Sequence, residues 1–404
     1  MRSKRFSLRL FLSLNWGRNH TSTVWLASLF LTLFTARTTS LYAQNTDTDA
    51  SAASAFLGES SCASSGCHGG AGEKHDQTIR WKKLDVHTRS FATLTGARSA
   101  RIADNLKISD PTVSSRCTVC HEPFQTIANT DALVKALDPA SGVSCENCHG
   151  PAQKWLLGHT RPDWTHADRV HAGMRDLDNI YTRANSCVAC HQNVDGDILK
   201  AGHPELIFEL DGQSVTEPKH WREKPNWSGP QTWLVGQAVG LREMSWQLSR
   251  ETVAGEHAEA RTSAVLWLLE SAAKGNDALP SASISGDVTP NNAAAAQKWA
   301  DDFAKQAAAS SWSAADARKC LEALAATGAS FREPNVKHST VARRAERLVL
   351  ALDRLIAGLG DPDTSKRLDA PLNQLFKDAQ SIPDFKPQVF AGHLDDFQQT
   401  LVGK

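Results

Sequence analysis

The sequence predicts a mainly α-helical protein whose two halves differ in character. Residues 57–230 contain eight of the nine cysteines, many glycines and prolines, and little regular apolar periodicity. This pattern predicts short helices separated by turns. From residue 231 onward, apolar side chains recur at helical spacing, which predicts a small bundle of longer helices. The length of 404 residues suits two such domains.

The first 43 residues have the pattern of an export signal. Five basic residues lie among the first 18, an apolar run follows at 24–34, and small and polar residues lead to a cleavage point at Ala43. The run is short for a membrane span, and an uncleaved anchor is the alternative. Residues 44–56 form a polar linker. We therefore expect an exported, periplasmic protein with no transmembrane span in its mature chain.

The charge balance argues against nucleic acid as a partner. The whole chain has 44 basic and 44 acidic residues, and its first 43 residues include six basic and no acidic ones. The mature part is therefore acidic by about six charges, which disfavours binding to a phosphate backbone.

The spacing of cysteine and histidine is the strongest chemical signal in the chain. Three segments have the pattern Cys-x-x-Cys-His. Two such thiols can add to the two vinyl groups of one haem, and the histidine that follows then ligates the iron. Zinc sites also use paired cysteines, but neither zinc nor a disulfide requires a histidine after each pair. We interpret these residues as haem attachment points and iron ligands: Cys117, Cys120 and His121; Cys145, Cys148 and His149; Cys187, Cys190 and His191.

A fourth segment has four residues between its cysteines, Cys62 and Cys67, and ends with His68. This spacing is a minority variant of the haem motif, and the alternative is a local disulfide beside an unrelated histidine. Three nearby glycines would let the backbone approach a flat ligand. With this motif the chain is expected to bind four covalent haem c groups, which would supply the apolar interior of residues 57–230.

Histidine is expected to complete the iron coordination, because the mature chain has only two methionines. Bis-histidine ligation implies a lower potential than methionine ligation. We expect His87, His159 and His203 to be distal ligands. His220 and His75 are weaker candidates. We include His220 in the expected ligand set and leave His75 out. The histidines at 166 and 171 are flanked by charged residues, which indicates exposure to solvent.

The run from Gly142 to Pro151 closely resembles the tetrahaem cytochrome c-554 family, as do the following His159 and the segment from Asp85 to Phe91. The resemblance covers roughly residues 57–205. It implies closely packed haems, distal ligands at His87 and His159, and electron transfer. The longer first motif, the Ala-Gly-His-Pro run at 201–204 and the C-terminal extension depart from the family pattern. The family's one iron without a second protein ligand therefore cannot be assigned here.

The C-terminal domain, 231–404, is expected to contain three to five helices with short connections. Apolar spacing predicts helices over 261–274, 291–308, 313–327 and 339–359, and Ser313 with Asp316 predicts a helix cap. The ninth cysteine, Cys320, is interpreted as a small buried hydrophobe, with a reactive thiol as the alternative. This domain is interpreted either as a docking or covering domain or as an appendage that stabilises the chain.

The expected function is that of an electron carrier and not of an enzyme. The chain has no phosphate-binding loop, dinucleotide fingerprint or Ser-His-Asp signature. The alternative is an oxidoreductase that acts on nitric oxide, nitrite or hydroxylamine at an open iron. Expected partners are redox proteins, with a membrane-bound oxidoreductase as one alternative.

Overall fold

A computed structural model describes residues 54–126, 141–224, 228–250, 255–277, 279–281, 284 and 286–403. The predicted export signal and residues 44–53 of the predicted linker lie outside the described residues. Two of the last three linker positions contact the chain just after the third motif. Ser54 Oγ donates to the Pro151 carbonyl oxygen at 3.1 Å, and the Ala55 amide donates to Gln153 Oε1 at 2.9 Å.

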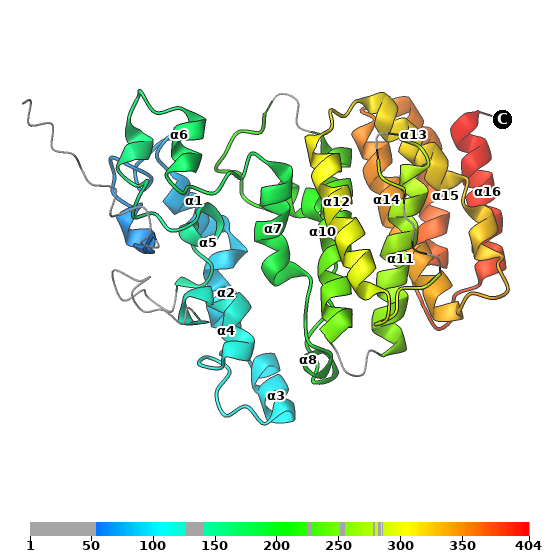
Figure 1. The fold of residues 1–404 in the computed structure, drawn as a ribbon, viewed down its shortest axis with the longest axis horizontal. Coiled ribbons are helices and arrows are strands. Elements are labelled where there is room, and N and C mark those ends of the chain that lie inside the picture. Colours follow the sequence, from blue (N-terminus) through cyan, green and yellow to red (C-terminus); the bar gives the residue numbers. More distant parts are fainter. Residues whose placement is uncertain are drawn as a thin grey trace, which may run out of the picture. The chain divides into compact units, whose positions relative to one another are not determined.

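The protein is mainly α-helical, as the sequence predicts, and no β-strand occurs among the described residues (Figure 1). Short helices and turns make up the described part of residues 57–224, and long helices follow. The first group is α1 Gln77–Leu84, α2 Ser90–Thr93, α3 Ala97–Leu106, α4 Ser115–His121, α5 Cys145–His149, α6 His166–His171, α7 Ile180–His191, α8 Gly196–Lys200 and α9 Leu210–Thr216. The second group is α10 Gly229–Arg250, α11 Glu256–Ala273, α12 Ala293–Ala309, α13 Ala314–Ala325, α14 His338–Gly358, α15 Pro362–Asp378 and α16 Pro387–Val402.

The long helices enclose the main apolar core. Helix α10 packs against α12, α11 and α14, and α16 packs against α15 and α13. Fully buried aromatic side chains, among them Trp233, Phe303 and Phe390, fill the space between them. Burial of this apolar surface is what stabilises helices of this length.

Several helices lie where the sequence predicts them. Helix α3 has the bounds expected for 97–106, and α11, α12, α13 and α14 begin and end within a few residues of the expected ranges. Ser313 caps α13 and forms a reciprocal capping box with Asp316. Cys320 is fully buried, and its thiol donates to the Ala272 carbonyl oxygen at 3.6 Å. Burial raises the pKa of this thiol to about 12, which disfavours a reactive thiolate.

Helix α10 was not predicted as a separate helix, because it is buried on nearly every side from Pro230 to Leu241. A helix without a polar face lacks the periodicity that marks an amphipathic helix. Gly236 allows the close approach of α9, because a Cβ there would lie 2.7 Å from Leu210 Cβ.

Contacts cross the expected domain boundary at residue 230. Ala184 and Val188 of α7, together with Phe208 and Leu210, belong to the same apolar core as α10. The two-domain division therefore stays a prediction. Within the described ranges, no helix combines the length and the apolar character that crossing a bilayer requires.

Candidate functional site

Three of the four cysteine motifs end short helices. His121 is the last residue of α4, His149 of α5 and His191 of α7. Residues three apart on a helix lie on one face, so the two thiols of each Cys-x-x-Cys pair project together. The sequence spacing thus translates directly into a shared direction for both thiols.

The first motif forms a tight turn in place of a helix. The His68 amide donates to the Cys62 carbonyl oxygen at 3.1 Å, and the Gly69 amide donates to the Ser64 carbonyl oxygen at 3.0 Å. A Cβ on Gly69 would lie 1.9 Å from the Ala63 carbonyl oxygen. Glycine is therefore required here by the chain's own backbone.

Each motif histidine lies close to one of the four expected distal histidines. His121 and His203 have no ring contact among the described residues. Burial lowers the pKa of His121, and the charge of nearby His203 also acts to lower it. The other pairs, with the distances between their ring centres, are His68 with His159 at 6.1 Å, His191 with His87 at 5.9 Å and His149 with His220 at 6.3 Å.

These distances fit two imidazoles that bind one iron from opposite faces. A metal–nitrogen bond is about 2.0 Å long and the ring centre lies roughly 1 Å beyond the nitrogen, so two such rings lie about 6 Å apart. The four distal candidates are all half-buried, whereas His75, His166 and His171 are exposed. His75 donates to the Cys67 carbonyl oxygen at 2.7 Å, and His166 contacts Asp176.

The Nδ1 atoms of the distal histidines are held by acceptors. His87 Nδ1 contacts Asp85 Oδ1 at 2.9 Å, and the partners of the other three are backbone carbonyl oxygens. A carbonyl oxygen can only accept, so Nδ1 carries the proton and Nε2 is left with its lone pair for a metal. This second contact is typical of histidines that ligate metals. The carbonyl contacts are His159 to Leu156, His203 to Pro204 at 2.8 Å and His220 to Pro218 at 3.3 Å.

Two motif histidines are held in the same way. His68 Nδ1 contacts Gln77 Oε1 at 2.9 Å, and His121 Nδ1 contacts the Ser90 carbonyl oxygen at 2.9 Å. Burial lowers the pKa of His149 to about 4. A neutral imidazole is the form that binds a metal, so the surroundings of these residues fit the ligand role.

Thiols of different motifs also lie together. Cys62 and Cys145 lie close enough to shift each other's pKa, and so do Cys120 and Cys190. Burial, followed by the neighbouring Cys187, raises the pKa of Cys148 to about 12. Along this series of contacts, the first motif adjoins the third, the third adjoins the fourth, and the fourth adjoins the second. All eight cysteines are free of disulfides and so could form thioethers.

Glu146, inside the third motif, organises the backbone around it. Its side chain is 1% exposed, and its carboxylate accepts hydrogen bonds from the amides of Leu57, Gly58 and Ala152 at 2.7–3.0 Å. The loop before the first motif is thus fixed to the third motif. No sequence pattern marks Glu146 for this role, because its three partners are backbone amides and two of them lie far along the chain.

Arg175 supports the same motif from the other side. Its guanidinium donates to the carbonyl oxygens of Asn147 at 2.5 Å and Cys148 at 2.9 Å, and its amide donates to the His149 carbonyl oxygen at 2.8 Å. The last carbonyl groups of a helix have no hydrogen-bond donor within the helix itself. Arg175 supplies donors for these groups at the end of the one-turn helix α5.

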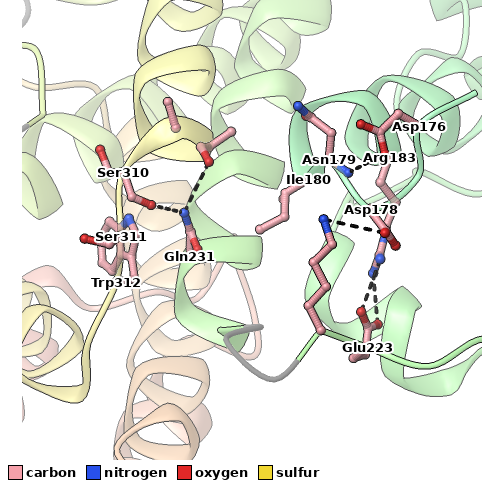
Figure 2. Close-up of a pocket in the computed structure, with 13 residues that line it drawn as sticks. Asp176, Asp178, Asn179, Ile180, Arg183, Glu223, Gln231, Ser310, Ser311 and Trp312 are labelled. Atoms are coloured by element: carbon pink, nitrogen blue, oxygen red, sulfur yellow. Dashed lines mark hydrogen bonds and ion pairs between the residues drawn. The ribbon is translucent and has the colours of Figure 1, made fainter. Parts of the chain in front are cut away.

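A polar cavity of about 420 Å³ lies at the beginning of α7 (Figure 2). Its charged side chains are paired with one another, Arg183 with Glu223 at 2.9 Å and Lys224 with Asp178 at 3.5 Å. None of the described residues that line it belongs to a cysteine motif or to the distal histidine set. We therefore assign this cavity no part in the site.

Comparison with known families agrees with this geometry. Residues 61–150 match the family described as cytochrome c554 and c-prime. The matched segment contains the first three motifs and ends one residue after His149, so the fourth motif lies beyond it. No curated protein and no solved structure matches the chain. The family implies covalently bound haem c and a redox role.

Proposed function

We propose that the protein is a c-type cytochrome that transfers electrons through four covalent haems, a proposal supported by the match of residues 61–150 to the cytochrome c554 and c-prime family. Each of the four Cys-His motifs would hold one haem. The observation that carries the proposal is the ring contact of three motif histidines with three distal candidates, while His203 lies near the remaining motif histidine, His121. Such a set provides two imidazole ligands for each iron.

The residues of the chain have three tasks in this proposal. The eight motif cysteines attach the groups, the paired histidines coordinate iron, and the Nδ1 acceptors keep each imidazole in one orientation. Haem c with two imidazole ligands exchanges single electrons at a lower potential than haem with a methionine ligand. The protein sets that potential through ligation, hydrogen bonding and burial.

We propose that electrons follow the order in which the motifs adjoin. The thiol contacts support a path from the first motif through the third and fourth to the second. His149 is also close enough to His68 and His159 for their charges to lower its pKa, after the larger effect of burial. The first and third haems would therefore be near neighbours.

Conversion of a small nitrogen compound is the less favoured function. Turnover at a haem requires a coordination position that the substrate can reach. Four histidine pairs support a second ligand at each iron, which slows the binding of small molecules because a histidine must leave first. Electron transfer does not require such a step.

We place the protein in the periplasm, with redox proteins as its partners and a membrane-bound oxidoreductase as one candidate. The sequence pattern of residues 1–43 supports export, and haem proteins of this kind exchange electrons by contact with other proteins. The acidic mature chain would favour a partner with a basic docking surface.

Redox cycling of the purified holoprotein tests the proposal. The reduced protein is mixed separately with nitric oxide, nitrite and hydroxylamine, and with a small electron acceptor. We expect fast oxidation by the acceptor and no multiple turnovers with the nitrogen compounds. Sustained turnover of any of them, on the order of one per second or faster, would overturn the proposal in favour of an enzyme.

A further inference from the structure

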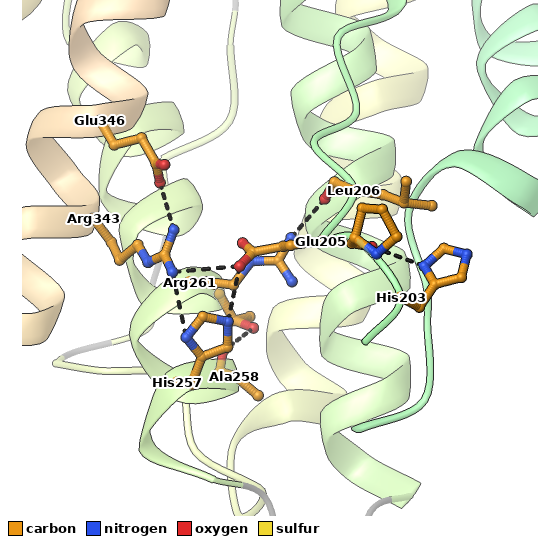
Figure 3. Close-up of polar contacts among 10 residues, drawn as sticks. His203, Glu205, Leu206, His257, Ala258, Arg261, Arg343 and Glu346 are labelled. Carbon is orange, nitrogen blue, oxygen red and sulfur yellow. Dashed lines mark hydrogen bonds and ion pairs between the residues drawn. The ribbon is translucent and has the colours of Figure 1, made fainter. Parts of the chain in front are cut away.

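The segment from His203 to Leu206 links the distal ligand set to the long helices (Figure 3). His203 is the expected distal ligand of the second motif, and its Nδ1 contacts the Pro204 carbonyl oxygen at 2.8 Å. Two residues later, Glu205 points away from His203 and toward α11 and α14. Two residues of extended chain span at most about 7 Å, so Glu205 lies close to His203 along the chain.

Three basic side chains of the long helices hold Glu205. Arg261 Nε lies 2.6 Å from Glu205 Oε1, in an ion pair too bent to count as a hydrogen bond. His257 Nε2 lies 3.0 Å from Oε2, and Arg343 Nη2 lies 3.4 Å from the same oxygen. Arg261 and Arg343 are only 10% and 12% exposed, so these pairs are poorly screened by water.

Further contacts fix the geometry of this group. Arg261 Nη2 donates to the Leu206 carbonyl oxygen at 2.8 Å, so the same guanidinium holds side chain and backbone. Arg343 Nη1 donates to Glu346 Oε2 at 2.9 Å. Arg343 Nη2 also contacts His257 Nδ1 at 3.3 Å, which leaves His257 Nε2 as the protonated nitrogen that donates to Glu205.

The chain on either side of the segment is also anchored. Before it, the His203 amide donates to the Ile198 carbonyl oxygen at 3.2 Å, and Asn105 Nδ2 donates to the Ala201 carbonyl oxygen at 3.1 Å. After it, Phe208 is 2% exposed and belongs to the core of the long helices. Along the chain from His203 to Phe208, Glu205 is therefore the charged residue nearest to His203 that contacts α11 and α14.

We propose that Glu205 is a positioning residue for His203, and that α11 and α14 thereby hold the distal ligand of the second-motif haem in place. This inference rests on the proposed function, because it requires His203 to ligate iron. It gives the C-terminal helices a task within the redox site itself, beyond docking or general stabilisation.

The test compares Glu205→Gln with Glu259→Gln in the four-haem holoprotein. Glu259 lies on α11, is about as buried as Glu205 and pairs with Lys337, with no contact to residues 203–206 seen among those the structure describes. Carbon monoxide is added to the reduced proteins, and its binding is followed by visible absorption. We expect Glu205→Gln to bind carbon monoxide at one haem in four at least about tenfold faster than the wild type, since removing one charge frees the segment. The Glu259→Gln variant should behave as the wild type.

His203→Ala separates the inference from the proposed function. If this variant opens one haem while Glu205→Gln matches the wild type, Glu205 does not position the ligand, and the ligand set stands. If His203→Ala opens no haem, the ligand assignment in the proposed function is wrong. Equal opening of all four haems in Glu205→Gln, with loss of helical circular dichroism, would show a merely structural role. Should Glu205→Gln fail to accumulate, Arg343→Gln takes its place and leaves the Leu206 contact intact.

Discussion

A histidine becomes a specific iron ligand when its second nitrogen is held. His87, His159 and His220 each have an acceptor at Nδ1 and a ring contact with a motif histidine. Exposed His75 also has an Nδ1 acceptor, the Cys67 carbonyl oxygen, but no ring contact with a motif histidine is seen among the described residues. The hydrogen bond therefore orients a ligand only where the opposite imidazole is also in place.

Replacement of a distal histidine should open one haem. In His159→Ala, the haem of the first motif loses its sixth ligand, so we expect one haem in four to become high-spin, with the others unchanged. Visible absorption and electron paramagnetic resonance of the ferric protein measure this fraction. His166→Ala is the control and should leave all haems low-spin. An unchanged spectrum in His159→Ala would remove His159 from the ligand set.

The carboxylate of Glu146 should contribute strongly to stability. In Glu146→Gln, the amide group cannot accept all the hydrogen bonds that Leu57, Gly58 and Ala152 donate, and we expect a loss of about 2 kcal/mol. Thermal unfolding monitored by circular dichroism measures the change. The control is Glu73→Gln, since exposed Glu73 pairs with Arg222 at 3.7 Å and should contribute under about 0.5 kcal/mol. Equal melting temperatures for both variants would contradict this role.

At the scale of elements, helix α7 has two functions. It ends in the fourth motif, and its other face packs against α10 and α12 in the main core. A polar group reinforces this packing. Asp301 of α12 accepts hydrogen bonds from the Tyr181 hydroxyl at 2.6 Å and from Arg242 Nη1 at 2.9 Å, and it pairs with Lys305 at 2.7 Å. These contacts join α7, α10 and α12.

Asp301→Asn should weaken this junction in a pH-dependent way. Burial alone would raise the pKa of Asp301, but the hydrogen bonds from Lys305, Tyr181 and Arg242 outweigh burial and lower it to about 2. A depressed carboxyl pKa stabilises the fold above the unfolded-state value of 3.8, and this stabilisation is lost as the pH falls toward 2. We expect the variant to lose about 1–2 kcal/mol at pH 7, and less below about pH 4.

Thermal unfolding at several pH values between 7 and 3 measures this difference. Asp302→Asn is the matched control, because Asp302 lies on the exposed side of α12 and pairs with an exposed lysine, Lys298. A destabilisation by Asp301→Asn that is constant between pH 7 and pH 3 would show that the charge of Asp301 is not the cause.

At the scale of the whole molecule, two different interiors lie along the chain. The long helices bury their own aliphatic and aromatic side chains in one continuous core. The described part of residues 54–180 instead has scattered buried residues, such as Trp81 and Trp155, around the histidine pairs. This difference is expected if haems supply the apolar interior of that region, because short helices cannot bury enough apolar surface alone.

The number of haems is a property of the whole chain and can be measured by mass. We expect the intact protein to carry four covalent haems after acid–acetone extraction, and the Cys62→Ala/Cys67→Ala variant to carry three. The Cys320→Ala variant is the control and should keep four, because Cys320 lies in the helical core. Three haems in the wild type would mean that the first motif, with its longer spacing, is not an attachment site.

The sequence by itself determined the features that depend on neighbouring residues. The attachment motifs, the cap of α13, the bounds of α3 and the approximate positions of α11, α12 and α14 follow from spacings of a few residues. The family of residues 61–150 was recognisable for the same reason, since its most specific run spans ten consecutive positions. The mainly helical class follows from the sum of these local patterns.

Only the tertiary structure decided which histidine faces which motif. His87 follows the first motif in sequence but lies opposite His191 of the fourth, and His220, a weaker candidate from sequence, lies opposite His149. The path of the chain between motifs sets these pairs, and no local periodicity records it. The same is true of Glu146 and Glu205, whose partners lie far along the chain. Their roles follow from burial and charge pairing, which exist only once the chain has folded.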